Sequence, residues 1–205
     1  MELLDVINAR RSVKKFEPEH EISDDEFETL FGRVSLSPSS FNIQPWRFVV
    51  VRDRERKKAL RGCAMNQAQV EEASATIIVV GKLDAYTDAE EITADMPADV
   101  RDRSVRMIRN FYEGNAALQR DEAIRSTSLA AMTLMLAAQD LGYATGPMIG
   151  FDPDAVSKEV GLGENEIPVM LIVIGKEQGK SRPRGHRFKI SRIVNFDRRD
   201  GRPLE

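Results

Sequence analysis

The sequence has little of several residue types on which common kinds of site depend. Cys63 is the only cysteine, so no disulfide can form within the chain and no paired thiolates are present to bind zinc. The two histidines lie in charged segments, and the patterns H-E-x-x-H, G-x-S-x-G and G-x-G-x-x-G do not occur. Hydrolase chemistry, a metal site and a dinucleotide-binding Rossmann unit therefore have no support.

Charge and hydropathy argue against two further classes of partner. The formal net charge is −3 at pH 7, which gives no overall attraction to nucleic acid or to an anionic membrane. There is no run of about 18 apolar residues, so no membrane-spanning helix is expected. The first residues include early acidic side chains and no long apolar stretch, which is not the pattern of a signal peptide, and a cytoplasmic location is expected.

The length of 205 residues fits a single domain, and the order of predicted elements indicates an α+β fold. Ser23 and Glu26 form a capping box at the start of a helix predicted over residues 24–36, where apolar residues recur at helical spacing. A continuous β-branched run at 75–80 is typical of a strand covered on both faces. Other strands are predicted at 46–52 and 169–175, and other short helices at 2–9, 53–63 and 66–73.

The second half of the chain contains a long predicted helix between less regular segments. Residues 84–120 are charged and interrupted by a proline and a glycine, which predicts a helical insertion or lid. Residues 122–141 predict a helix that is apolar around most of its circumference, buried by its own core and by a partner subunit, and followed by Gly142. Another helix is predicted to begin at Asp152, and the basic tail at 180–205 is expected to lack regular structure.

Two basic segments are candidates for an anion site. They consist of Arg10, Arg11, Ser12 and Lys14 after the first helix, and Arg182 and Arg184 in the tail. Arginine forks, a lysine charge and a hydroxyl together suit a phosphate. Positive charges at the C-terminal end of a helix are also stabilised by the helix dipole, so a purely structural role for these residues is the alternative. Nucleic acid is not expected, because no aromatic residues are interleaved for base stacking.

A polar loop precedes the first predicted strand. It contains Pro38, Ser39, Ser40, Phe41, Asn42 and Gln44, and Trp46 follows as the packing anchor of the strand. Serine and asparagine beside proline are common turn formers, so a simple turn is one interpretation. Amide side chains donate and accept hydrogen bonds, which is what a heterocycle with ring N–H and C=O groups requires. Two weaker candidates are the pair Asn66 and Gln69 and the segment Gly146–Asp152, where two glycines around a proline allow close approach to the backbone.

Taken together, these motifs resemble the nitroreductase family of flavoproteins. The resemblance is carried by R10-R-S-V-K14, P38-S-S-x-N-x-Q-P-W46 before a strand, Asn66, P147-M-I-G-F-D152 and the final basic segment, and it covers nearly the whole chain. The P-S-S-x-N-x-Q-P-W segment is its most specific element. The resemblance implies a mostly antiparallel sheet flanked by helices, in an intertwined homodimer with FMN at the subunit interface.

The resemblance also implies roles for individual residues. The phosphate and ribityl chain of FMN would be held by Arg10, Arg11, Ser12, Lys14, Arg182 and Arg184. The neighbouring subunit would supply Pro38, Ser39, Ser40 and Asn42, and Gln44 of the same loop is a further candidate for cofactor binding. Asn66 would hydrogen-bond to the pyrimidine edge of the flavin, and the backbone at Ile149 and Gly150 would face flavin N5, with Met148 beside them as a further candidate for cofactor binding. Gln69 stands where many members have a lysine, so it keeps a donor and loses the charge. At Ile149 some members have a glutamate, which affects the substrate pocket.

The implied activity is a ping-pong oxidoreductase, in which NADH or NADPH reduces FMN and a nitroaromatic or quinone is then reduced. No side chain is expected to be a catalytic acid or nucleophile, because the cofactor carries the chemistry. Phe41, Phe111 and Tyr112 would border the substrate pocket, although Phe111 and Tyr112 equally suit a core. The alternatives are a specialised relative (a dehalogenase, an azoline dehydrogenase or a flavin-consuming enzyme), an FMN-binding protein without turnover, and a structural dimer whose polar loop is only a turn.

Overall fold

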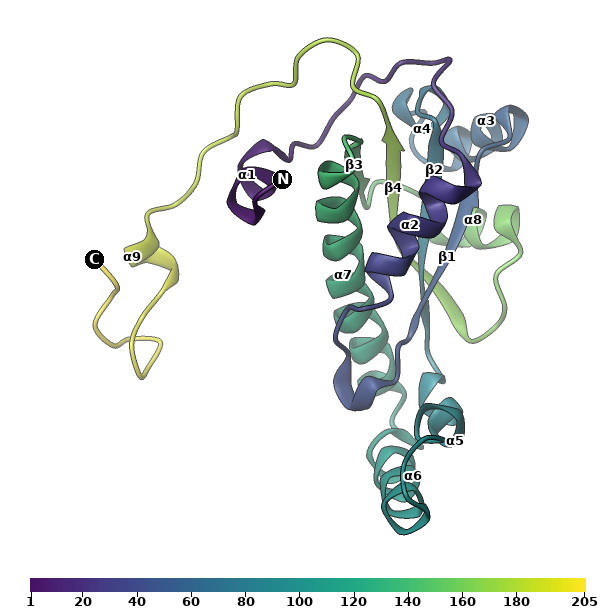
Figure 1. The fold of residues 1–205 in the computed structure, drawn as a ribbon, viewed down its shortest axis with the longest axis vertical. Coiled ribbons are helices and arrows are strands. Elements are labelled where there is room, and N and C mark those ends of the chain that lie inside the picture. Colours follow the sequence, from purple (N-terminus) through teal and green to yellow (C-terminus); the bar gives the residue numbers. More distant parts are fainter.

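The computed structural model describes residues 1–205 and contains a four-stranded sheet with helices on both faces (Figure 1). The strands are β1 (Trp46–Val51), β2 (Ala75–Lys82), β3 (Ala144–Met148) and β4 (Glu166–Gly175), in the spatial order β1-β2-β4-β3. All neighbouring strands pair antiparallel. The predicted α+β fold with an antiparallel sheet is therefore confirmed.

Strand β2 lies inside the sheet and is buried along nearly its whole length, as its β-branched sequence predicts. Side chains alternate between the faces of a strand, so Ile77 and Ile78 belong to different cores. The core around Ile77 is covered by α2 (Asp24–Val34) and α7 (Ala116–Asp140) and includes Trp46. The core around Ile78 is covered by α3 (Arg54–Cys63), α4 (Gln69–Glu72) and α8 (Pro153–Val160).

Capping residues set the ends of the main helices. Ser23 and Glu26 form the predicted capping box of α2, and Asp152 caps α8. The long helix α7 begins at Ala116, earlier than the predicted 122, because the Asn115 side chain accepts a hydrogen bond from the Leu118 N–H at 3.1 Å. Its first turns therefore fall in the segment that the sequence predicts as the insertion.

Strand β3 is an element that the sequence analysis missed, since 144–152 is predicted there only as the approach to a helix. Pro147 weakens the local strand signal, but an edge strand tolerates a proline. On its outer side β3 meets the segment after the first helix: the Val13 N–H donates to the Thr145 carbonyl at 2.9 Å. A Cβ added at Gly146 would lie 2.7 Å from the Val13 carbonyl oxygen, so this close approach requires glycine.

The insertion and the two terminal segments lie outside the main layers (Figure 1). The insertion contains η2 (Ala85–Asp88), α5 (Ala89–Ile92) and α6 (Ala98–Tyr112), which share a small core of their own with Ile43. Helix α1 (Leu3–Ala9) exposes most of its apolar side chains, and the tail runs away from the body after β4. The tail is not entirely irregular, because it forms the short helix α9 (Ile190–Ile193) and an antiparallel bridge between Asn195 and Pro203. None of the helices has the length and apolarity needed to cross a membrane.

Candidate functional site

The two basic segments come together around one cavity of about 610 Å³. They meet because the chain after α1 runs beside the start of the tail: the Gln178 N–H donates to the Lys15 carbonyl at 3.0 Å, and the Glu17 N–H donates to the Lys176 carbonyl at 2.9 Å. The cavity is lined by the cations Arg10, Arg11, Lys14, Lys15, Lys180, Arg182, Arg184 and Arg187, together with Ser12 and Ser181. Glu177 is the only carboxylate in the lining.

The side chains of two of these arginines bind carbonyl groups at the C-terminal end of helix α1. Arg184 Nη2 donates to the carbonyls of Ile7 at 2.9 Å and Asn8 at 3.1 Å, and Arg11 Nη1 donates to the carbonyl of Asn8 at 2.6 Å. The structural alternative, in which cations satisfy the end of a helix, therefore describes these two side chains. Arg10, Lys14 and Arg182 make no side-chain hydrogen bond or ion pair within the chain, so their charges are available to a ligand.

The electrostatics of the cavity favour an anion. Burial lowers the pKa of Arg184, and the neighbouring charges of Arg11, Arg187 and Arg10 lower it further. In addition, the Ser181 hydroxyl is buried without a hydrogen-bond partner although it lines the cavity. Unbalanced like charges and an unpartnered hydroxyl fit a phosphate-bearing group, which would neutralise the charges and accept from the hydroxyl.

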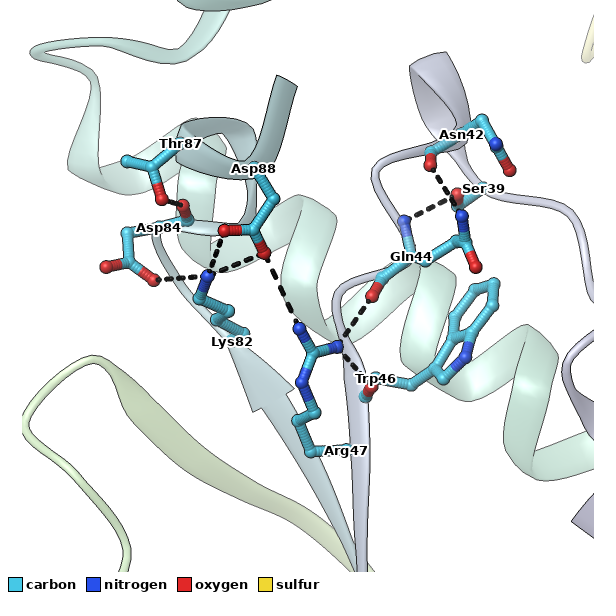
Figure 2. Close-up of polar contacts among 9 residues, drawn as sticks. All are labelled: Ser39, Asn42, Gln44, Trp46, Arg47, Lys82, Asp84, Thr87 and Asp88. Carbon is cyan, nitrogen blue, oxygen red and sulfur yellow. Dashed lines mark hydrogen bonds and ion pairs between the residues drawn. The ribbon is translucent and has the colours of Figure 1, made fainter. Parts of the chain in front are cut away.

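The polar loop adopts a backbone that few residues tolerate. The short 3-10 helix η1 (Ser40–Asn42) forms its centre, and Phe41, Asn42 and Gln44 have φ values of 50°, 57° and 44°. The Ser39 hydroxyl accepts from the Gln44 N–H at 3.0 Å, and the Gln44 amide donates to the Asn42 carbonyl at 3.3 Å (Figure 2). Left-handed residues other than glycine persist only where surrounding contacts hold them, and they concentrate at functional sites. The Asn42 side chain makes no bond within the chain and is exposed.

An ion-pair network fastens this loop to the insertion. Arg47 Nη1 donates to the Gln44 carbonyl at 3.1 Å, and its Nη2 lies 3.5 Å from Asp88 (Figure 2). Lys82 Nζ lies 2.6 Å from the same Asp88 carboxylate. From the insertion side, the Tyr112 hydroxyl donates to Ser40 Oγ at 2.9 Å. Sequence reasoning missed this network, because residues from β1, β2 and the insertion meet here only through the fold.

Aromatic rings lie beside the loop. The centroids of Phe41 and Phe111 are 5.3 Å apart, and those of Phe41 and Tyr112 are 6.1 Å apart. Tyr112 is buried in the small core of the insertion, whereas Phe111 is half exposed and leaves one side of its ring open to solvent. Burial raises the pKa of the Tyr112 hydroxyl, which therefore stays protonated as the donor to Ser40.

A third group of predicted residues surrounds the turn after β3. Met65 and Asn66 are both left-handed, each with φ 54°, and they lie in the loop between α3 and α4. The end of α3 and this loop both contact the turn: the Asp152 N–H donates to the Cys63 carbonyl at 2.8 Å, and Gln67 Nε2 donates to the Gly150 carbonyl at 3.0 Å. The N–H groups of Ile149 and Gly150 donate to no group in the chain. The turn therefore offers two backbone donors.

The polar side chain of Gln69 does not point toward these donors. Gln69 is 6% exposed, and its Nε2 lies 3.0 Å from Gln67 Oε1 and 3.4 Å from Met148 Sδ. Met148 is itself buried, and Ile149 is 81% exposed. Among the residues predicted around this turn, Asn66, Ile149 and Gly150 are thus accessible, while Gln69 and Met148 lie behind them.

Along the strand direction, the turn after β3 lies between the basic cavity and the polar loop, because Met148 is level with Ile78 in the middle of β2. The positions of the two regions can be compared on strand β2. Ser12, which lines the cavity, pairs with Thr145 of β3, and through Ile174 of β4 this position is level with Ala75. Trp46, which follows the polar loop, pairs with Gly81. Six residues of β2 separate these positions, 81 − 75, which is about 20 Å at roughly 3.3 Å per residue. Within one chain, the predicted site is therefore divided between opposite ends of the sheet.

The fold and the site together define an α+β protein with a cavity lined by cations and with a turn after β3 that has two free backbone donors. The model of the nitroreductase family matches residues 7–176. The chain is 36% identical over 203 residues to MhqN of Bacillus subtilis, which carries the name of an NAD(P)H nitroreductase, with 95% of this chain and 98% of that protein covered. It is 40% identical over 177 residues to protein DrgA of Synechocystis, with 86% and 84% covered.

A solved structure gives the same result. A protein from Exiguobacterium sibiricum, described as a nitroreductase and solved in complex with FMN, superposes with a TM-score of 0.90 at 34% identity, with 96% of this chain and 98% of that chain covered. The chain belongs to the nitroreductase family.

Proposed function

We propose that this protein is an FMN-dependent oxidoreductase that takes hydride from NADH or NADPH and passes reducing equivalents to a small acceptor. The observation that carries the proposal is the cavity lined by eight cations, of which Arg10, Lys14 and Arg182 have no partner within the chain. The relatives support it, since one is named an NAD(P)H nitroreductase and another contains FMN. Bound FMN would supply hydride acceptance and donation at N5.

The residues of the chain would bind and orient the cofactor rather than exchange protons. Arg10, Lys14 and Arg182 would hold the phosphate, because their charges have no partner within the chain. Ser12 and Ser181 would add hydroxyl contacts. Arg11 and Arg184 would contribute mainly by ending α1 beside the cavity.

At the other end of the cofactor, hydrogen-bond donors and acceptors would recognise the ring system. Asn66 would meet the pyrimidine edge, and the N–H groups of Ile149 and Gly150 would face N5. Gln69 would act from behind the turn, without direct contact.

The site would be completed by a second copy of the chain. The polar loop lies about 20 Å from the basic cavity along the sheet, so Pro38, Ser39, Ser40 and Asn42 would reach a flavin held by another subunit. Surfaces without an intrachain partner support this arrangement, among them Leu129 and Met132 on α7, which are 47% and 40% exposed. The insertion would then act as a lid over the acceptor, with Phe41 and Phe111 as an aromatic wall that favours flat rings such as quinones or nitroaromatics.

Subunit sharing can be tested by mixing two defective variants. Arg10→Ala and Asn42→Ala subunits, unfolded and refolded together, would form hybrid dimers with one doubly defective site and one intact site. We expect FMN binding to return in about a quarter of all sites if half of the dimers are hybrids. A mixture that binds no more FMN than the separate variants would show that each site lies within one chain.

The activity itself is tested by the colour of the purified protein. We expect one FMN per chain, bleached by NADH or NADPH without oxygen and recovered when a quinone is added. FMN that binds but is not bleached by either nucleotide would indicate a flavin-binding protein without turnover. Failure to take up FMN would refute the proposal.

A further inference from the structure

Two glutamine side chains link helix α4 to the turn after β3. Gln67 Nε2 donates to the Gly150 carbonyl at 3.0 Å, and Gln69 Nε2 donates to Gln67 Oε1 at 3.0 Å. The second glutamine is held in turn, since it is 6% exposed and packs against Met148 of β3. The contact between positions 67 and 150 joins residues 83 apart in the sequence, so it fixes two separate loops relative to each other.

The orientation of both amides follows from their partners. A backbone carbonyl only accepts hydrogen bonds, so the NH₂ group of Gln67 must face Gly150 and its oxygen must face Gln69. That oxygen needs a donor, and the NH₂ group of Gln69 supplies it. The two glutamines therefore form a chain of two hydrogen bonds, called the relay below, in which Gln69 donates to Gln67 and Gln67 donates to the carbonyl of Gly150.

The next two N–H groups of the turn are occupied. The Phe151 N–H donates to the Ile149 carbonyl at 3.1 Å, and the Asp152 N–H donates to the Cys63 carbonyl at 2.8 Å. The Gly150 carbonyl is held by Gln67, and among the N–H groups of residues 149–152 only those of Ile149 and Gly150 have no partner. The relay thus holds the turn in a conformation that leaves two donors directed away from the protein's own acceptors.

We propose that Gln67, supported by Gln69, is a positioning residue that holds the peptide units of Ile149 and Gly150 where they meet the reacting edge of the cofactor. This inference rests on the proposed flavin function, because the donors need a cofactor to act on. The relay acts through the Gly150 carbonyl, because the amide groups of both glutamines are bonded within the chain. Its effect is on the rate of hydride transfer, since misplacing a group at the reacting atom by about 1 Å is enough to lower a rate by about 100-fold.

The test replaces Gln67 with methionine, which has a similar length and neither donates strongly nor carries charge. In the cofactor-free full chain, we expect the amide hydrogens of Phe151 and Asp152 to exchange about 5- to 10-fold faster, because the turn loses one anchoring hydrogen bond. In the FMN-loaded protein, we expect flavin reduction by NADH or NADPH to slow about 10-fold, with the Kd for FMN within about 3-fold of the wild type.

Two further variants serve as comparison and control. Gln69→Met leaves the bond to Gly150 and removes its support, so it should change exchange and reduction in the same direction by about 2- to 3-fold. Gln139→Met makes the same chemical change on α7, where the glutamine side chain forms no hydrogen bond in the chain, and should leave both measurements unchanged.

Each remaining outcome would overturn the proposal. Unchanged exchange in Gln67→Met would show that the relay does not hold the turn, and faster exchange with wild-type flavin reduction would show that holding it does not matter for hydride transfer. A large loss of FMN affinity would assign Gln67 to binding rather than positioning. If the wild type itself binds no FMN, the proposed function fails and the positioning role fails with it, while hydrogen exchange still reports whether the relay holds the turn.

Discussion

Arg10 and Arg11 are neighbours in sequence and both line the basic cavity, but the structure gives them different surroundings. Arg10 has no bonded partner, whereas Arg11 donates to the carbonyls at the end of α1, including that of Asn8 at 2.6 Å. A charge-assisted hydrogen bond contributes about 1.5–3 kcal/mol, so losing one corresponds to about 10- to 150-fold in Kd. Because Lys14 and Arg182 remain in the cavity, we expect Arg10→Ala to weaken FMN binding by about 10- to 30-fold.

The same comparison gives opposite expectations for stability. Arg11→Ala removes favourable contacts at a helix C-terminus, which are worth about 0.3–1 kcal/mol, so the Tm of the cofactor-free protein should fall by about 1–4 °C. Arg10→Ala removes one like charge from a crowded cavity, so its Tm should not fall. Fluorescence titration of FMN and thermal melts of both variants measure these effects. The assignment is refuted if Arg10→Ala keeps wild-type FMN affinity or if Arg11→Ala loses as much affinity as Arg10→Ala.

Two other contacts give predictions of their own. Tyr112→Phe should lower the free energy of unfolding by about 1 kcal/mol in denaturant titrations, because Ser40 loses its donor, and Ser40→Ala should add little to it. Additive losses in the double variant would mean that this hydrogen bond contributes no stability. For Glu26, hydrogen bonds from the Tyr143 hydroxyl and then from Ser23 lower the pKa from 4.5 to about 2. A depressed carboxyl pKa stabilises the fold above about pH 4.5 and loses that effect as the pH falls toward 2, so Glu26→Gln should show a smaller drop in stability between about pH 7 and pH 3. An identical drop in both proteins would exclude this role for Glu26.

Most of the fold could be predicted from the sequence, because the signals for its elements are local. The capping box of Ser23 and Glu26 marks the start of α2 within four residues, and the β-branched run of β2 marks a strand covered on both faces. Strand β3 could not be predicted in this way, because Gly146 and Pro147 weaken the local signal. Its pairing with β4 and its contact with Val13 stabilise it, and these partners are distant in the sequence.

The candidate site divides in the same manner. The sequence by itself determined which side chains could bind an anion or the polar edge of a ring, because the chemistry of a side chain does not depend on the fold. Which of them are free was decided only by the tertiary structure: Arg184 reaches the carbonyl of Ile7 across 177 positions, and Gln69 turns inward to Gln67. The separation of the polar loop from the basic cavity was likewise set by the sheet register. Hydrogen bonds between distant segments follow from packing the whole chain, and no local pattern encodes them.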